Sequence, residues 1–325
     1  MSPLFEALGT RYPIFQGGMA WVADAHLALA VSEAGGLGII GAGHAPADYV
    51  RAQIRAVKAR TTRPFGVNIM LLSPYVDEIV AMVAEEHVAV VTTGAGDPAK
   101  YLPQLQAAGT KVLPVVPSVG LAKRMVRAGV DGVVAEGMES GGHIGSLTTM
   151  ALVPQVVDAV DVPVIAAGGI ADGRGMAAAL ALGAVGVQMG TRFLVATETH
   201  IHPNYKAAVL AAKDVGTLVT GQYVGHAARV LKTPMSRNFV TLEKQIALSG
   251  TDDFTAIEEL GNGSLRRGVQ DGDRERGSFM AGEVAGMVTK EQPAAEILAE
   301  VAAGAAKLLA GSPLAANLHP TKVVS

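Results

Sequence analysis

The chain has 325 residues, is 50% hydrophobic and carries a formal net charge of −3 at pH 7. This length can bury a large core, and the small net charge gives no reason to expect nucleic acid or an anionic membrane as partner. The absence of cysteine excludes disulfides, iron–sulfur clusters and cysteine nucleophiles. No secretory signal opens the chain, and its most apolar window is too short to span a bilayer. We therefore expect a cytoplasmic protein.

Eight short apolar runs recur along the first 190 residues. They cover residues 13–16, 37–40, 65–70, 88–92, 111–116, 132–136, 162–167 and 186–190. Segments with helical periodicity separate them, for example residues 25–34, 47–58, 74–85, 121–128 and 173–182. Continuous apolar strands that alternate with helices predict a parallel sheet, and eight of them favour a closed (β/α)8 TIM barrel. A doubly wound sheet is the alternative, but the first strand lacks the Gly-x-Gly-x-x-Gly pattern of dinucleotide-binding folds.

The helix that should follow the eighth strand is missing from its expected place. Residues 200–205 are turn-prone, and a clean amphipathic helix returns only at residues 294–309, after Pro293. We therefore predict a small, mostly helical domain, residues 196–277, inserted between strand 8 and its helix and lying over the barrel mouth. The barrel would comprise residues 1–195 and 278–312, with a polar tail at 313–325.

The segment from residue 135 to 145 follows the sixth apolar run and combines glycines, two carboxylates and one histidine. In a barrel of this kind the loops after the strands build the site. His143 is the candidate catalytic residue, because the unperturbed pKa of histidine suits proton transfer near neutral pH. Glu136 and Glu139 can orient the histidine, bind a ligand hydroxyl or remain solvated, and the sequence leaves these alternatives open.

Glycines follow both of the last two predicted strands. Gly168 and Gly169 end the seventh, and Gly190 precedes Thr191 at the end of the eighth. Backbone N–H groups at these two positions form the common phosphate site of this fold, although a Gly-Gly pair can also be a simple tight turn. Without a Gly-Lys-Thr loop, the pattern favours a bound phosphorylated cofactor over a nucleotide hydrolase.

Other side chains at the strand ends suit a flat heterocycle. Asn68 and Gln188 can hydrogen-bond it, and Met19 can pack on a ring, although Met19 can equally be core filler. His200 and His202 have alternate spacing but no evident third ligand, so the sequence predicts no metal site. His226 would lie in the inserted domain near the mouth. The remaining histidines are interpreted as surface residues: His26, His44, His87 and His319.

The motifs at residues 13–21, 64–68, 136–145, 167–173 and 190–193 resemble those of one enzyme family. The chain is similar to the flavin-dependent enoyl-acyl-carrier-protein (enoyl-ACP) reductases II, within the wider nitronate monooxygenase (2-nitropropane dioxygenase-like) family. The resemblance implies FMN in the barrel mouth, NADH or NADPH as reductant, and a trans-2-enoyl thioester on acyl carrier protein (ACP) as substrate in fatty acid synthesis. It further implies a homodimer and a response to monovalent cations, whose site the sequence does not place.

The resemblance also implies roles for individual residues. His143 would lie near flavin N5 as the proton donor. The implied cofactor contacts are Gly17, Gly18, Met19, Asn68, Glu136, Gly142, Gly168, Gly169, Gln188, Met189, Gly190 and Thr191. Glu283 departs from the family pattern, in which Gln is expected. Arg229, Lys232 and Arg237 are candidates for contact with an acidic carrier protein.

Two other functions remain open at this stage. The first is a nitronate monooxygenase, which has the same fold and flavin but oxidises alkyl nitronates with O2 and needs no NADH. The second is a flavin- or phosphate-binding protein without turnover, in which His143 is only structural.

Overall fold

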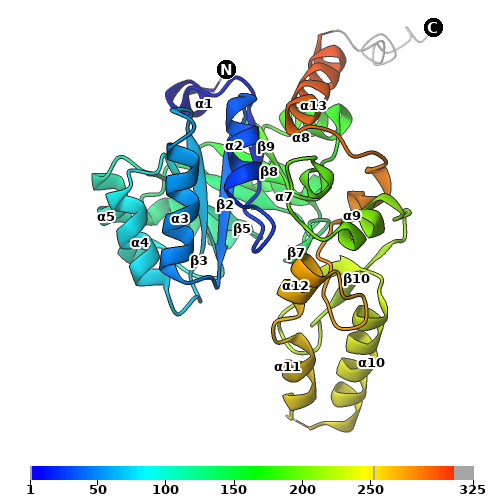
Figure 1. The fold of residues 1–325 in the computed structure, drawn as a ribbon. Coiled ribbons are helices and arrows are strands. Elements are labelled where there is room, and N and C mark those ends of the chain that lie inside the picture. The colour runs from blue at the N-terminus through cyan, green and yellow to red at the C-terminus, as the bar shows by residue number, and fades with distance from the viewer. Residues whose placement is uncertain (1, 252, 311–325) are drawn as a thin grey trace, which may run out of the picture.

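The computed structural model describes residues 2–251 and 253–310, and in this part of the chain eight parallel strands form a barrel (Figure 1). The strands are β1 (Ile14–Gln16), β2 (Gly38–Gly43), β3 (Phe65–Met70), β4 (Val90–Gly94), β5 (Lys111–Val116), β6 (Val133–Glu136), β8 (Val164–Ala167) and β9 (Gly186–Met189). They are ordered β1-β9-β8-β6-β5-β4-β3-β2, and a parallel bridge from Phe15 to Leu37 joins the two ends. The predicted (β/α)8 barrel is confirmed.

Gln16 strengthens the seam where β1 meets β2. Its side chain is fully buried, and its Nε2 donates to the carbonyl oxygen of Ile39 at 3.2 Å. Its Oε1 accepts from the backbone N–H of Ile39, also at 3.2 Å. One amide side chain thus pairs both backbone groups of a residue that would otherwise leave them unsatisfied in a buried setting.

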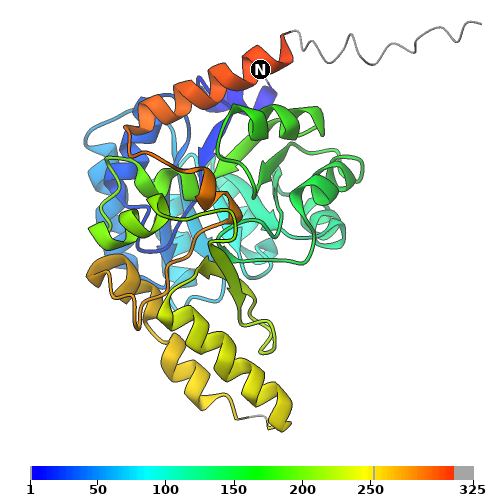
Figure 2. The same ribbon diagram turned by 90° about the vertical axis from the view of Figure 1, so that its right-hand side faces the viewer.

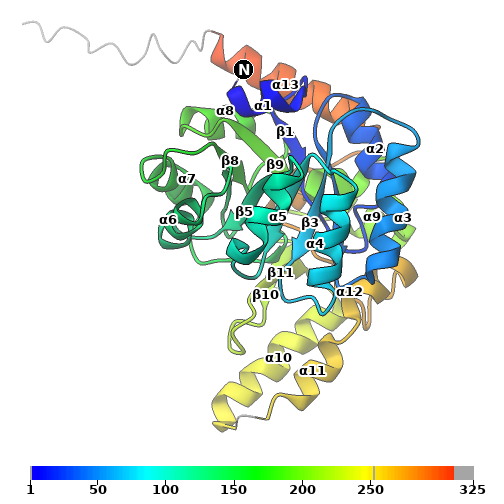
Figure 3. The ribbon, with the colours of Figure 1, turned by 90° about the vertical axis from the view of Figure 1, so that its left-hand side faces the viewer.

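The barrel helices cover the outside of the sheet (Figures 1 and 3). They are α2 (Ala25–Glu33), α3 (Ala47–Lys58), α4 (Val76–Glu85), α5 (Leu102–Ala107), preceded by η1 (Ala99–Tyr101), α6 (Val119–Ala128), α7 (Thr149–Val157), α8 (Gly173–Ala181) and α13 (Ala294–Leu309). As predicted, the helix of the eighth strand is α13. It packs between α8 and α2 and closes the ring, with Ile297 and Leu298 fully buried.

The short helix α1 (Pro3–Leu8) closes the end of the barrel at which the strands begin. Its Leu4, Phe5 and Leu8 belong to one apolar cluster with inward-facing strand residues such as Phe15. The rings of Phe5 and Phe15 meet edge to face, with centroids 5.5 Å apart. Because α1 fills this end, the opposite end, where the strands finish, is left for the site.

The segment between β9 and α13 contains helices and one hairpin. Its elements are η2 (Thr191–Val195), α9 (Pro203–Leu210), β10 (Thr217–Thr220), β11 (Ala228–Leu231), α10 (Pro234–Ser249), α11 (Thr255–Gly261), α12 (Ser264–Arg266), the π-helical turn η3 (Arg267–Asp271) and η4 (Glu283–Met287). The pair α10–α11 extends away from the barrel, at the end opposite α1 (Figures 1 and 2).

An apolar cluster lies where this inserted segment meets the barrel. It includes Leu194, Tyr205, Leu231 and Phe279, and the rings of Tyr205 and Phe279 stack with centroids 4.4 Å apart. Some residues of this cluster lie between positions 196 and 277, the predicted domain boundaries, and others lie before or after them. The boundaries of a separate inserted domain therefore stay a prediction.

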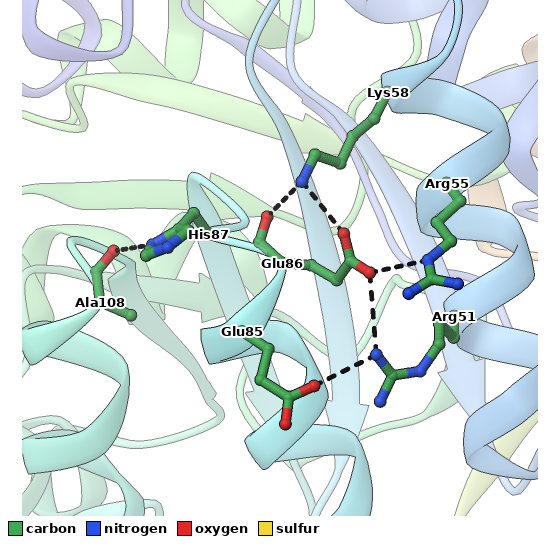
Figure 4. A network of polar contacts seen from close by, with 7 residues as sticks. All are labelled: Arg51, Arg55, Lys58, Glu85, Glu86, His87 and Ala108. Atoms are coloured by element: carbon green, nitrogen blue, oxygen red, sulfur yellow. Dashed lines mark hydrogen bonds and ion pairs between the residues drawn. The ribbon is translucent and has the colours of Figure 1, made fainter.

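An ion-pair network joins α3 to the end of α4 at the face from which the strands begin (Figure 4). Glu86 accepts from Arg55 at 2.9 Å and from Lys58 at 3.0 Å, and these bonds lower the pKa of its carboxyl group. Arg51 bridges Glu86 to Glu85. Exposed pairs of this kind contribute at most about 1 kcal/mol each, so the network supports the fold at the end remote from the mouth.

The predicted tail, residues 313–325, lies outside the described residues. Among the residues that are described, no helix is both long and apolar enough to cross a membrane.

Candidate active site

The strand ends bring most of the predicted cofactor residues to one face of the barrel. Asn68 lies in the second half of β3, and its Nδ2 donates to Thr92 Oγ1 of β4 at 3.0 Å. Gly18, beyond β1, lies against Asn68 so closely that an added Cβ would stand 2.1 Å from the Asn68 Cβ. Such a contact is impossible for any other residue, so the β1 loop can occupy this position only with glycine.

The β1 loop also contacts β9. The backbone N–H of Gly17 donates to the carbonyl of Met189 at 2.9 Å, and a Cβ on Gly17 would lie 3.2 Å from Gln188 Cγ. Met19 packs against the apolar core between sheet and helices and against the cluster that includes Tyr205 and Phe279, with its Sδ close to Gly190. The β1 loop therefore forms one wall of the mouth.

Gln188 and Met189 point to opposite sides of the sheet. The side chain of Gln188 is buried, and its Oε1 has no hydrogen-bond partner among the described residues. Met189 instead packs in the core between sheet and helices and is 1% exposed. Only the backbone of Met189 is thus placed to face the mouth, because alternate residues of a strand face opposite sides.

The two glycine positions after β8 and β9 have the geometry of an anion site. Gly168 and Gly169 adopt positive φ values of 90° and 70°, a turn that L side chains rarely adopt. The hydroxyl oxygen of Thr191 accepts from the backbone N–H of Gly282 at 2.8 Å, so its own hydrogen remains able to donate to a ligand. Backbone N–H groups and a hydroxyl donor together suit a phosphate.

Glu136 is the last residue of β6 and is partly buried. Desolvation raises the pKa of its carboxyl group to about 7. The group therefore changes charge near neutral pH. A carboxyl group with this pKa can release or accept a proton under physiological conditions.

Glu139 has a structural role that differs from the three alternatives considered from the sequence, because it bonds to Thr149. Both of its carboxylate oxygens lie 2.9 Å from the backbone nitrogen of Thr149, at the first turn of α7. The Thr149 hydroxyl in turn lies 2.9 Å from Glu139 and 3.1 Å from the Gly168 carbonyl. Glu139 thus ties the loop after β6 to α7 and to the Gly168 turn.

His143 lies in a two-residue strand, β7 (Gly142–His143), which the sequence did not reveal. β7 pairs with β11 of the inserted segment, so that His143 is opposite Ala228 in the sheet β10-β11-β7. Ile144 continues the pairing by donating to the Ala227 carbonyl at 3.0 Å. Two residues are too few for a period-2 pattern, so no local signal could have predicted this strand.

The imidazole of His143 is accessible to solvent, but the surrounding protein shapes its ionisation. Desolvation lowers its pKa, and the charges of His226 and His44 lower it further. The lowered pKa favours the neutral form of the ring. His226 is exposed, and its predicted position at the mouth stays a prediction. His44, which the sequence placed on the surface, is exposed, but the sequence did not indicate that its charge acts on His143.

Arg229 is buried, which corrects its interpretation as a surface contact for a carrier protein. It is 5% exposed, its Nε donates to the Met138 carbonyl at 3.0 Å, and it pairs with Glu283 at 3.0 Å. Glu283, which departs from the family pattern, supplies the negative charge for this arginine. Together they hold the loop that precedes β7 against the inserted segment.

Comparison with known proteins agrees with this geometry. A family model described as nitronate monooxygenase matches residues 1–81 and 73–304. The chain belongs to the nitronate monooxygenase family. FabK from Thermotoga maritima is 49% identical with a TM-score of 0.90, over 95% of this chain and 97% of that one. This match confirms the resemblance to the enoyl-ACP reductases II.

Two curated relatives carry other names. The (3aS,4S,5R,7aS)-5-hydroxy-7a-methyl-1-oxo-octahydro-1H-indene-4-carboxyl-CoA dehydrogenase of Mycobacterium tuberculosis is 37% identical, over 86% of this chain and 73% of that protein. A probable nitronate monooxygenase of Staphylococcus haemolyticus is 33% identical, over 89% and 92% of the two chains. The family is one of flavin enzymes, and the chain is accordingly an oxidoreductase.

The residues at the mouth fit FMN, the flavin of this family. The Gly168–Gly169 turn and the free Thr191 hydroxyl suit its phosphate. The unpaired Gln188 Oε1 offers an acceptor to a donor on a bound ring or polyol, and such a buried orphan needs a partner that the described residues do not supply. Because Gly18 has no side chain, the β1 loop packs directly against Asn68.

Proposed function

We propose that the chain is an FMN-dependent enoyl-ACP reductase that uses NADH or NADPH to reduce trans-2-enoyl thioesters in fatty acid synthesis. The observation that carries this proposal is the 49% identity with FabK across almost the full length of both chains. The position of His143 on β7, the two-residue strand that follows β6, supports it.

The proposal gives each part of the mouth a role. FMN supplies the hydride chemistry when it is bound. Gly168, Gly169, Gly190 and Thr191 hold its phosphate. Asn68 and Gln188 hydrogen-bond its ring or polyol, while Gly17, Gly18, Met19 and the backbone of Met189 line the space that it occupies. Gly142 lets the backbone turn next to His143, with a φ of 80°.

The proton for the substrate α-carbon comes from His143, or from a water that His143 positions. A lowered pKa makes the imidazolium form of His143 a stronger acid but a less populated one, so a water positioned by the neutral ring can serve as the immediate donor. Glu136, whose pKa is about 7, is the other group at the mouth that holds a proton at this pH. We propose that Glu136 holds a second proton that the site can transfer.

The second candidate is a nitronate monooxygenase, favoured by the 33% identity with the staphylococcal protein that bears this name. Anaerobic mixing with NADH or NADPH separates the two. A reductase loses the yellow absorbance of its flavin rapidly and regains it on addition of a crotonyl thioester. A nitronate monooxygenase loses its colour only with an alkyl nitronate, and that result would reject the reductase.

The carrier protein is proposed to dock on cations of the inserted segment. Exposed Lys232 lines a groove of about 440 Å³ together with Lys213 and Arg274. These charges complement an acidic partner. Lys232→Glu should raise KM for crotonyl-ACP several-fold and leave KM for crotonyl-CoA unchanged. An equal effect on both substrates would contradict this docking site.

Homodimer formation, a cytoplasmic location and a response to monovalent cations also stay proposals. Size-exclusion chromatography with light scattering tests the dimer, and activity in potassium against tetramethylammonium salts tests the cation response.

A further inference from the structure

Three side chains outside the mouth converge from two distant parts of the chain. Asp24 and His26 flank the start of α2, and His200 follows η2 on the way into the inserted segment. The sequence considered His200 only with His202. In the structure His202 is used elsewhere, because its Nδ1 accepts from Asn204 N at the start of α9. Asp24 and His26 take its place beside His200.

The three groups present their ligating atoms to one point. Nδ1 of His26 lies 3.1 Å from Asp24 Oδ2, and Nδ1 of His200 lies 3.5 Å from the same oxygen. All three ligating atoms lie within 4.8 Å of one another. Around a tetrahedral Zn²⁺ with bonds of about 2.0–2.1 Å, neighbouring ligand atoms stand roughly 3.3 Å apart. The two Nδ1–Oδ2 distances are close to that spacing, and the third pair of ligating atoms is no more than 4.8 Å apart.

The contacts of Asp24 also suit a metal, because its two carboxylate oxygens face different partners. Its Oδ1 accepts from the backbone N–H groups of His26 and Leu27, at 3.0 and 3.1 Å, and caps α2. Its Oδ2 is thereby fixed toward the two imidazoles. The carboxylate is oriented by the helix that it caps, which is the role that outer contacts play in protein metal sites.

The two histidines keep the site open to solvent. Their rings lie with centroids 4.2 Å apart, and their side chains are 54% and 56% exposed. A divalent ion can therefore reach them directly and keep water at its remaining position. Two imidazoles and one carboxylate are a donor set that Zn²⁺ accepts.

We propose that Asp24, His26 and His200 bind a divalent cation of the zinc class. The ion would tie the β1 loop, which includes Met19, to the segment that leads from β9 into α9. The site is separate from the mouth and does not depend on the proposed reductase activity.

Zinc binding to the FMN-loaded protein tests the proposal. After treatment with EDTA and its removal, calorimetric titration with ZnCl2 should show one site per chain. His200→Asn and His26→Asn should each weaken that binding by at least about tenfold, since loss of an outer contact alone costs this much. Asp24→Asn should do the same while keeping the helix cap, because Asn is an equally good N-cap residue.

Controls separate this site from other histidines. His87→Asn replaces an exposed histidine at the far end of the barrel, where its Nδ1 meets the Ala108 carbonyl (Figure 4), and should bind zinc as the wild type does. His226→Asn removes an exposed histidine of the inserted segment and should also leave binding unchanged. X-ray absorption at the zinc edge should show two imidazole ligands.

The thermal midpoint provides a second readout. Excess ZnCl2 should raise it in the wild type, because binding to the folded state alone stabilises that state, and should not raise it in His200→Asn. The proposal fails if the wild type binds no zinc at millimolar concentration, if His200→Asn binds it as tightly as the wild type, or if His226→Asn loses it.

Discussion

His143 lies opposite Ala228 in the antiparallel pairing that joins β7, from the barrel, to β11, from the inserted segment. The candidate catalytic histidine is thus positioned by backbone hydrogen bonds to residues about 85 positions later in the chain. Arg229 adds a bond to the Met138 carbonyl on the same loop. The inserted segment is therefore part of the support of the site.

Loss of the His143 imidazole should impair turnover without loss of flavin. His143→Asn should lower enoyl reduction by at least about tenfold, in line with removal of a general acid. His87→Asn is the matched control, because it replaces an exposed histidine remote from the mouth. Steady-state rates and the flavin absorbance per protein are measured together. An unchanged rate would remove His143 from the reaction.

Glu136 should make stability depend on pH between about 4.5 and about 7. Its folded pKa of about 7 exceeds the ordinary value of 4.5, so its protonated form favours the folded state. The contribution of protonated Glu136 to the free energy of unfolding is complete below pH about 4.5. It is lost as pH rises through about 7, by an amount on the order of 3 kcal/mol.

Glu136→Gln removes this ionisation and keeps the size of the side chain. The free energy of unfolding in urea, measured at several pH values, should therefore fall less in the variant over that interval. Parallel curves for the two proteins would show that Glu136 ionises normally.

Gly18→Ala should expel FMN or unfold the β1 loop. The new Cβ would lie 2.1 Å from Asn68 Cβ, an atom that cannot move without its backbone. Overpacking of this kind costs about 1–3 kcal/mol or more. Gly94→Ala, at the end of β4, is the matched control, because nothing lies within 4 Å of its added Cβ. Thermal midpoints and flavin content are compared. Equal behaviour of the two variants would contradict the geometry.

Arg229 should matter more than its partner Glu283. Arg229→Met leaves the Met138 carbonyl and the carboxylate without their donor, and should destabilise the protein by about 2 kcal/mol. Glu283→Gln keeps an acceptor, and its side chain is 48% exposed, so its cost should stay below about 1 kcal/mol. Denaturation midpoints test the order, and a larger effect of Glu283→Gln would reverse the assignment.

Much of the barrel could be predicted from local patterns. The strand runs and the delayed eighth helix at residues 294–309 agree with the structure, whereas the roles of the residues near the strand ends stay predictions. The reason is that a buried parallel strand is a continuous apolar run, and the carboxyl ends of parallel strands meet on one face. Gly18, Asn68 and Gln188 could therefore be assigned to one mouth before any coordinates.

Only the tertiary structure decided which distant side chains meet. The pairing of β7 with β11, the burial of Arg229, the electrostatic effect of His44 on His143 and the convergence of Asp24 with His200 leave no periodic trace in the sequence. Such contacts join residues that are far apart in the chain. They form only when separate segments pack together, so no local pattern encodes them. Local hydrophobicity determined the elements, and their close packing determined the neighbours.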